Sequence, residues 1–291
     1  MQSKRWVYPR CASFGDREDG VVVVIKSYFD DSADEKRERF CAVGGLVGGP
    51  DQWKQFQNAW AAATYHLRGP FHAADCDCNP PRGIFSGWKK EDCDALMAAL
   101  VKLILKLRFT GFGSVVPVRE YRAIFPGADE YDPYLLALKH TLVNLGYFGN
   151  LFQEHTPFEM INFQIWHEAS KTTSGRAAQT FADFQALEDW RDGQYLRSFT
   201  TGQKTMLELQ AADLIAREAF KYADNLGVRR TRMPVKRLKD RMSFHLWNRE
   251  CLEFLRDRGG PENLRFLAEW AYLPSEQVPV FPRFYAEDFV A

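Results

Sequence analysis

Three acidic positions, far apart in the chain, stand next to apolar segments in a way that suggests a metal site. Asp30 and Asp31 follow the apolar run that begins at Val21, Glu168 comes just past "INFQIWH", and Asp213 lies within "LELQAADLIARE". Carboxylates are costly to remove from water unless a cation pairs with them. Several carboxylate oxygens at one point are what Mg²⁺ binds, together with water and substrate phosphate.

Each of these acids also has an ordinary interpretation. Asp30 and Asp31 are consistent with a solvated hairpin turn, because Asp and Ser are common turn residues. Spacing alone leaves Asp213 as a boundary residue that points to water, although it shares a helical face with Gln210 near the apolar stripe. If the acids do meet, two metal ions roughly 4 Å apart would activate a water and stabilise the leaving oxygen in phosphodiester cleavage.

The elements that must position these acids begin with two strands. Residues Val21–Phe29 are β-branched and aromatic, which favours a buried strand. Residues Arg39–Gly48 form the second candidate, and the polar link between them predicts an antiparallel hairpin with a loose, charged turn. The two aspartates are then expected at the open end of the hairpin.

The remainder of the chain alternates expected helices with expected strands. Helices are predicted over 49–67, 89–107, 132–148, 175–190 and 205–226, and strands over 109–118, 158–168 and 195–201. Residues 71–88 are expected to form a loop, and the tail from Gly227 is expected to be helical to about Tyr272. This order predicts one α/β core with a mixed sheet flanked by helices, helical insertions and a helical C-terminal extension. The predicted division is an N-terminal extension (1–19), the main domain (20–226) and a basic, helical extension packed on the same core (227–291).

The charge distribution restricts contacts with polyanions to local patches. Lysine plus arginine equals aspartate plus glutamate at 38 each, so no global basic field draws the protein to nucleic acid or to an anionic membrane. The stretch Val228–Arg241 carries seven basic residues and one acid. It is consistent either with a grip on a phosphate backbone, in which Arg229 and Arg230 take part, or with a solvated basic face.

Cysteine usage and hydropathy indicate a soluble cytoplasmic protein. The six cysteines include no C-x-x-C pair, so free thiols in a reducing compartment are expected. The alternation of acids and cysteines over Asp75–Cys78 lacks the second ligand pair of a structural zinc site and is interpreted as an ordinary loop. The first residues contain no apolar leader core, and no stretch approaches the ~20 apolar residues of a membrane span.

Three motifs then support a resemblance to a known family. The segment "YFDDSADEKRERFCAVGGLV" resembles the Y-[IV]-D-E-S-G-D…F-x-[LV]-G-G opening of the domain of unknown function 3800 family. "FHAADCDCNPPRGIFSGW" is similar to its F-H-A…G-x-F-x-G-W segment, and "LELQAADLIAREAFK" to its late L-Q-x-A-D-x-[IL]-A helix. The motifs occur in the family's order between Val21 and Ala223.

The resemblance implies a ribonuclease H-like fold and metal-dependent nuclease chemistry. Asp30 matches the family's leading acid, Asp31 stands where Glu is usual, and Asp213 matches the acid of the late helix. Ala33 replaces the customary Gly, and the acid usual at the end of the central strand in F-x-F-D is absent. Glu168 either substitutes for that acid from two positions on, or the third ligand is missing.

The sequence therefore predicts a metal-dependent nuclease that hydrolyses phosphodiester bonds of DNA or RNA with Mg²⁺ or Mn²⁺. A catalytically degenerate module that binds nucleic acid or a protein partner is the alternative. The predicted catalytic residues are Asp30, Asp31, Glu168 and Asp213, the predicted metal ligands are Asp30, Glu168 and Asp213, and the predicted substrate contacts are His72, Gln210, Arg229 and Arg230. For His72, a proton-carrying role and a structural hydrogen bond are both open.

Overall fold

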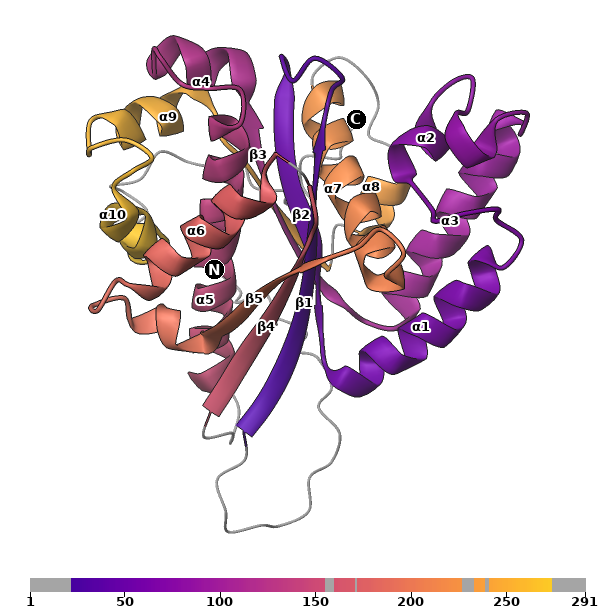
Figure 1. The fold of residues 1–291 in the computed structure, drawn as a ribbon, viewed down its shortest axis with the longest axis horizontal. Coiled ribbons are helices and arrows are strands. Elements are labelled where there is room, and N and C mark those ends of the chain that lie inside the picture. Colours follow the sequence, from indigo (N-terminus) through magenta and orange to yellow (C-terminus); the bar gives the residue numbers. More distant parts are fainter. Residues whose placement is uncertain (1–21, 155–159, 171, 227–232, 239–240, 274–291) are drawn as a thin grey trace.

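A six-stranded sheet runs through the centre of the molecule, with helices on both of its faces (Figure 1). The computed structural model describes residues 22–154, 160–170, 172–226, 233–238 and 241–273. The strands are β1 (Val22–Ala33), β2 (Phe40–Gly48), β3 (Thr110–Pro117), β4 (Met160–Glu168), β5 (Leu196–Gly202) and β6 (Met242–Leu246).

The strand order is β5-β4-β1-β2-β3-β6, with the first strand in the interior of the sheet. β1 pairs antiparallel with β2, and β2 pairs antiparallel with β3. On its other side β1 pairs parallel with β4, and β4 pairs parallel with β5. Three antiparallel strands followed by two parallel ones in this order form a ribonuclease H-like mixed sheet, so the predicted fold class is confirmed.

Two sets of helices cover the sheet, and each set encloses its own hydrophobic core (Figure 1). One face carries α4 (Val118–Ile124), α5 (Asp132–Glu154), α6 (Ser174–Gln185), α9 (Arg249–Arg256) and α10 (Leu264–Glu269). The other carries α1 (Pro50–Thr64), α2 (Ala73–Asp77), α3 (Lys90–Lys106), α7 (Leu207–Asn225) and α8 (Met233–Leu238). Short 3₁₀ helices lie at η1 (Gly83–Phe85), η2 (Arg191–Tyr195) and η3 (Trp270–Tyr272).

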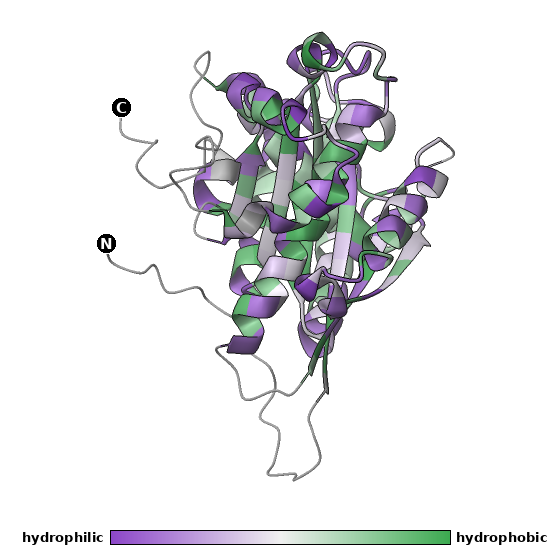
Figure 2. Ribbon diagram, turned by 90° about the vertical axis from the view of Figure 1, so that its left-hand side faces the viewer, coloured by the Kyte–Doolittle hydropathy of each residue, from purple (hydrophilic) through white to green (hydrophobic). Residues whose placement is uncertain are grey.

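Helix α1 shows how the hydrophobic pattern fixes an element on the sheet. Its apolar residues Trp53, Phe56 and Trp60 recur on one face, and all three are buried, as the spacing predicts. The Trp53 indole Nε1 also donates a hydrogen bond to the Lys26 carbonyl of β1 over 3.0 Å. Figure 2 shows hydrophobic residues along the strands and hydrophilic residues on the outer sides of the helices. Among the described helices, none has both the length and the apolar run needed to span a bilayer.

The hairpin differs from the prediction in where its first strand ends. Asp30 and Asp31 do not lie in a turn at the strand end, because β1 continues through them to Ala33. Asp30 pairs with Gly44 and Asp31 with Val43 in the register with β2. The continued backbone pairing overrides the low strand preference of aspartate.

Two further expectations are corrected. The segment 71–88, predicted to be a loop, contains helix α2 and the turn η1. The tail beyond Gly227, predicted to be helical, contains strand β6, which pairs parallel with β3. Met242, Phe244 and Leu246 alternate with less buried neighbours, and this period of two places β6 in the sheet.

Candidate metal-binding site

Strand register places the first two acids of the candidate site side by side. In the parallel ladder of β1 and β4, Tyr28 pairs with Trp166 and Phe29 with His167, so Asp30 and Glu168 follow as neighbours. Side chains alternate between the two faces of a strand, and both acids lie on the face that packs against α7. The Asp30 and Glu168 carboxyl groups share a hydrogen bond.

A glycine in β2 allows α7 to bring the third acid to the same place. Gly44 is the cross-strand partner of Asp30. A Cβ at Gly44 would lie 2.9 Å from the Ala216 Cα atom, so α7 can approach the sheet this closely only because no side chain intervenes. Asp213 precedes Ala216 by three residues and therefore lies on the same side of the helix. The charge of Asp213 consequently acts on Asp30.

Burial and the charges of neighbouring acids disfavour ionisation of Asp30 and Asp213. Asp30 is 6% exposed and Asp213 is 5% exposed. Burial, followed by the charges of Asp213, Glu168 and Asp31, raises the pKa of Asp30 well above its usual value. Burial likewise raises the pKa of Asp213 to about 6, although the nearby His72 and a hydrogen bond from the Ala73 N–H act in the opposite direction. Such a group of acids is a candidate functional site.

Two donors offset part of this negative charge. The Lys204 Nζ atom lies 3.0 Å from a Glu168 carboxylate oxygen, and the lysine side chain is 60% exposed. Partial burial opposes the Lys204 charge, but the neighbouring Glu168 raises its pKa overall. The backbone N–H of Ala73, at the start of α2, donates to the Asp213 Oδ2 atom over 2.7 Å. Lys204 and Ala73 were not predicted as site residues, because Lys204 lies outside the quoted motifs and Ala73, although part of the F-H-A motif, acts only through its backbone N–H.

The structure does not bring Asp31 into this group. Asp31 follows Asp30 in the same strand and therefore faces the opposite side of the sheet. There it accepts a hydrogen bond from the Arg37 Nη2 atom over 3.2 Å. His167 lies on that face as well, fully buried, with its Nδ1 atom 2.9 Å from the Glu168 carbonyl oxygen. Asp31 and His167 thus lie behind the site, on the opposite face of the sheet from the carboxyl groups of Asp30 and Glu168.

His72 lies beside the acids at the N-terminal end of α2. Its Nδ1 atom is 3.0 Å from the Asp75 Oδ2 atom, and its side chain is 39% exposed. Its charge acts on Asp213, which places the imidazole at the edge of the group. An exposed imidazole at this edge is open to a ligand.

Gln210 is instead engaged by the protein itself. Its Oε1 atom accepts hydrogen bonds from the Trp60 Nε1 atom over 3.1 Å and from the Phe71 N–H over 3.3 Å. Its amide nitrogen donates to the Lys204 carbonyl over 3.2 Å. Gln210 is 5% exposed, and it joins three segments of the chain at the side of the site.

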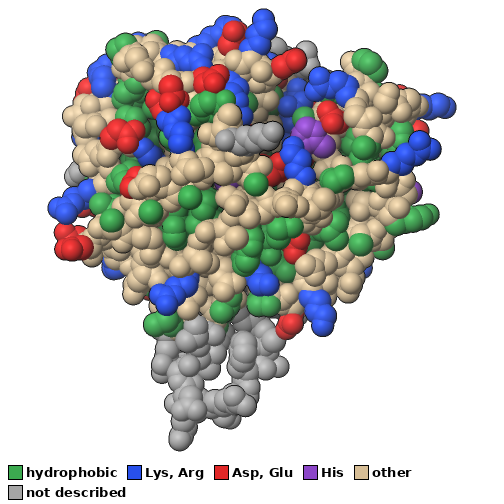
Figure 3. Space-filling model, in the orientation of Figure 1, with side chains coloured by type: hydrophobic (Ala, Val, Ile, Leu, Met, Phe, Trp, Pro, Cys, Tyr) green, Lys and Arg blue, Asp and Glu red, His purple; other side chains and the backbone are tan. Residues whose placement is uncertain are grey.

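The predicted basic contacts Arg229 and Arg230 lie outside the described residues. On the surface that Figure 3 shows, lysine and arginine side chains gather along the upper rim, mixed with acidic ones. The charge pattern there agrees with the balanced composition, in which basic patches are local.

The donor chemistry fits Mg²⁺ or Mn²⁺, but the acids are not preassembled around an ion. Three carboxyl groups supply the oxygen ligands that these metals bind. Within the described part of the chain, however, no group of three or more His, Cys, Asp or Glu side chains stands ready to hold a metal ion. The Asp30 and Glu168 carboxyl groups are hydrogen-bonded to each other, and Lys204 forms an ion pair with a Glu168 oxygen. Metal binding would separate the Asp30 and Glu168 carboxyl groups from each other and displace the lysine from Glu168.

Comparison with known proteins adds one structural likeness. No family model and no curated protein matches the sequence. The chain is similar to the crystal structure of Bst-RNase HIII in complex with Mn²⁺, at 13% sequence identity and a TM-score of 0.38. The likeness covers 71% of this chain, which spans about half (54%) of the length of that ribonuclease chain. The function proposed below rests on the strand order and side chains of this chain.

Proposed function

We propose that this protein is a metal-dependent nuclease that hydrolyses phosphodiester bonds of DNA or RNA. The observation that supports it is the convergence of three carboxyl groups from β1, β4 and α7, of which two, Asp30 and Asp213, are buried and have a raised pKa. Buried acids held against their own repulsion destabilise a fold, and a bound cation removes that repulsion. A function that needs a bound cation explains why the protein has these destabilising acids.

In this proposal Asp30, Glu168 and Asp213 hold Mg²⁺ or Mn²⁺. When bound there, the metal would lower the pKa of a coordinated water and offset the charge on the leaving oxygen. The Ala73 N–H keeps Asp213 oriented, and Gln210 holds the backbone at Lys204 and at Phe71. His72, exposed at the edge, contacts the substrate phosphate or carries a proton, and Asp31 supports the strand from the opposite face.

The proposal also includes the protein's family, its binding partner and its location in the cell. The ordered motifs around Asp30, His72 and Asp213 support membership of the domain of unknown function 3800 family. Nucleic acid is the proposed partner, and a cytoplasmic location agrees with the free thiols of the described cysteines. The division into residues 1–19, 20–226 and 227–291 stays a prediction, with β6 of the last part paired in the sheet.

One observation favours the second candidate function, a binding module that has lost catalysis. The ion pair between Lys204 and Glu168 already supplies a cation to the acids. If the lysine is a permanent replacement for the metal, the fold binds nucleic acid or a protein without cleaving it.

A cleavage assay separates the two functions. We expect the native protein to cut members of a panel of single- and double-stranded DNA and RNA in the presence of Mn²⁺. Asp30→Asn should lower that activity by more than about 100-fold, since even outer partners of metal ligands are worth 10–100-fold. Asp189→Asn is the matched control, because Asp189 is 79% exposed and should leave the rate unchanged. Cleavage that survives in Asp30→Asn would refute the catalytic assignment.

A further inference from the structure

A cavity of about 490 Å³ lies beside α2, between α3 and α8, on the same side of the sheet as the acids. Its floor is apolar and is made by Met97, Ala98 and Val101 of α3 and by Pro234 of α8. Ligand sites in proteins commonly enclose 300–1,000 Å³ and combine an apolar surface with a few polar groups. The cavity therefore has room for one planar ring system of moderate size.

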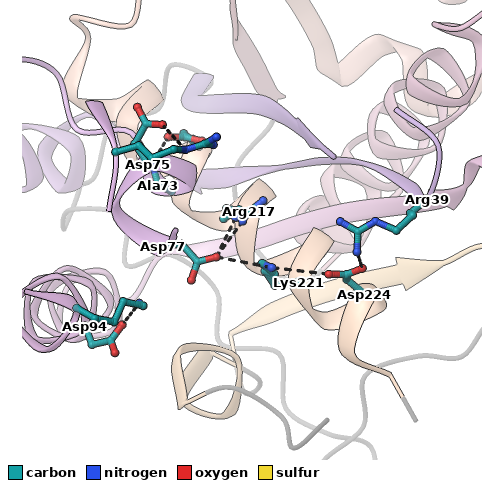
Figure 4. A network of polar contacts seen from close by, with 11 residues as sticks. Arg39, Ala73, Asp75, Asp77, Asp94, Arg217, Lys221 and Asp224 are labelled. Atoms are coloured by element: carbon teal, nitrogen blue, oxygen red, sulfur yellow. Dashed lines mark hydrogen bonds and ion pairs between the residues drawn. The ribbon is translucent and has the colours of Figure 1, made fainter. Parts of the chain in front are cut away.

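The rim of this cavity carries two acids and two bases, so its formal charge is balanced. Asp77 lines the rim, and its carboxylate is met by Arg217, 2.9 Å away, and by Lys221, 3.9 Å away. Figure 4 shows these three side chains in one network of polar contacts along α7. Arg217 compensates the charge of Asp77, whereas Lys221 is shared between Asp77 and Asp224, which lies 3.7 Å from it.

Helices α3 and α8 supply the other charged residues of the rim, which are Lys90, Asp94 and Arg237. Lys90 and Asp94 of α3 form an ion pair with each other, and both line the cavity. Arg237 of α8 lines it too, and within the described residues it makes no ion pair. An apolar floor below an arginine that is open to an anion is complementary to a nucleotide, which has a flat base and a charged phosphate.

Helix α2 connects this cavity to the acidic site. Ala73 of α2 donates to Asp213, and four residues on, Asp77 of α2 accepts from Arg217. Asp213 and Arg217 are also four residues apart, so the two contacts lie about 6 Å apart along α7. The cavity is therefore close enough to the acids for one short strand to reach both.

We propose that this cavity binds one base of a single-stranded nucleic acid, next to the phosphate that lies at the acidic site. The base lies on Met97, Ala98 and Pro234, and its phosphate contacts Arg237 and Lys90. The position of the bound base relative to the cleaved phosphate rests on the proposed nuclease function. The binding of the base in the cavity does not depend on that function. The base fits against apolar and thioether groups without hydrogen-bond readout, so the site accepts different bases.

Fluorescence anisotropy with a short labelled single-stranded oligonucleotide tests the proposal. The assay is run in EDTA, so that neither cleavage nor metal binding contributes. Ala98→Phe, which fills the floor, should weaken binding about tenfold at unchanged salt dependence. Arg237→Gln should weaken binding and lower the slope of log affinity against log salt by about 0.7, as expected for one lost phosphate contact on a single strand.

Two matched controls keep the result specific. Ala99→Phe adds the same ring to an exposed position of α3 outside the cavity, and Arg249→Gln removes an exposed arginine from α9 on the other face of the sheet. Both should bind as the native protein does, and circular dichroism should show all four variants folded.

The proposal is overturned if the native protein does not bind the oligonucleotide. It is also overturned if Ala98→Phe binds normally, or if the controls lose as much affinity as the cavity variants. Binding of a free mononucleotide in the cavity without binding of the strand would overturn it as well, since the occupant would then be a small molecule. A loss of cleavage in Asp30→Asn alongside normal binding by Ala98→Phe would leave the nuclease function standing and remove only this subsite.

Discussion

Two buried aspartates on opposite faces of the sheet show what separates a structural acid from a candidate catalytic one. Asp192 is fully buried, and the Tyr272 hydroxyl lies 2.7 and 2.6 Å from its two carboxylate oxygens. Arg191 adds an ion pair at 3.6 Å. Asp30 is 6% exposed, and the N–H of the next residue donates to it over 2.8 Å, but the charges that act on it most are those of the acids Asp213, Glu168 and Asp31.

The difference lies in the surroundings of the two carboxyl groups. Burial raises the pKa of Asp192, and the hydroxyl and guanidinium partners oppose that rise. Burial also raises the pKa of Asp30, and the neighbouring acids raise it further. The Asp192 contacts stabilise the fold, whereas the surroundings of Asp30 destabilise it until a proton or a cation arrives.

The largest expected effect comes from breaking the contacts of the structural acid. Tyr272→Phe removes the hydroxyl donor and leaves the Asp192 carboxylate buried with a weaker partner set. We expect the free energy of unfolding to fall by about 1–3 kcal/mol, the usual result of leaving a buried polar group unsatisfied. Urea denaturation at pH 7 measures it. An unchanged midpoint would mean that the hydrogen bond from Tyr272 to Asp192 does not stabilise the fold. Asp192 would then not be a structural acid in the sense used here.

At the candidate site, substitution of a buried acid is expected to raise the free energy of unfolding instead of lowering it. The pKa of Asp213 is raised from 3.8 to about 6, so the native state binds more protons than the unfolded chain between these pH values. Stability from this group is fully present below the lower value and is lost as pH rises through the upper one. Asp213→Asn should therefore stabilise the metal-free protein by roughly 1–2 kcal/mol at pH 8 and by little at pH 4.

Thermal denaturation in EDTA at the two pH values measures this difference. Asp257→Asn serves as the control, because the Asp257 side chain is 59% exposed and its loss should not depend on pH in this way. A destabilised Asp213→Asn at pH 8 would show that the acid supports the fold as Asp192 does.

The smallest effect is expected from the lysine that faces the acids. Lys204→Met removes the cation that takes up a Glu168 oxygen. An exposed ion pair is worth less than about 1 kcal/mol, so Mn²⁺ affinity should rise by no more than about fivefold. Calorimetric titration measures it, and a lower affinity in Lys204→Met would assign the lysine to the bound state instead.

Much of the fold follows from the sequence, because hydrophobic period and local composition set its main elements. The β-branched run into Asp30 predicts β1, and the spacing of Trp53 with Trp60 predicts α1. Strand β6 and helix α2 escaped prediction, since short elements carry few periodic residues and are held by tertiary contacts. The predicted hairpin turn ended β1 too early, because aspartate is common in turns and pairing with β2 is not visible locally.

The site depends on relations that no local pattern contains. Asp30 and Glu168 become neighbours through the register of two strands more than a hundred residues apart. Asp213 reaches them because Gly44 lets α7 approach the sheet. The motifs identify Asp30 and Asp213, and alternation along β1 puts Asp31 on the other face once the strand is known to continue to Ala33. The position of Lys204 beside Glu168 follows from three-dimensional packing alone.

Calorimetric titration with Mn²⁺ tests the central claim most directly, because it asks whether the three acids bind a cation. The account predicts that the native protein binds Mn²⁺, that Asp30→Asn and Asp213→Asn each abolish or greatly weaken binding, and that the exposed control Asp189→Asn binds normally. It also predicts proton release on binding at pH 6, since the raised pKa of Asp30 and that of Asp213 favour their protonated forms without metal. A native protein that binds no Mn²⁺, or one that binds it equally well without Asp30, would contradict the account.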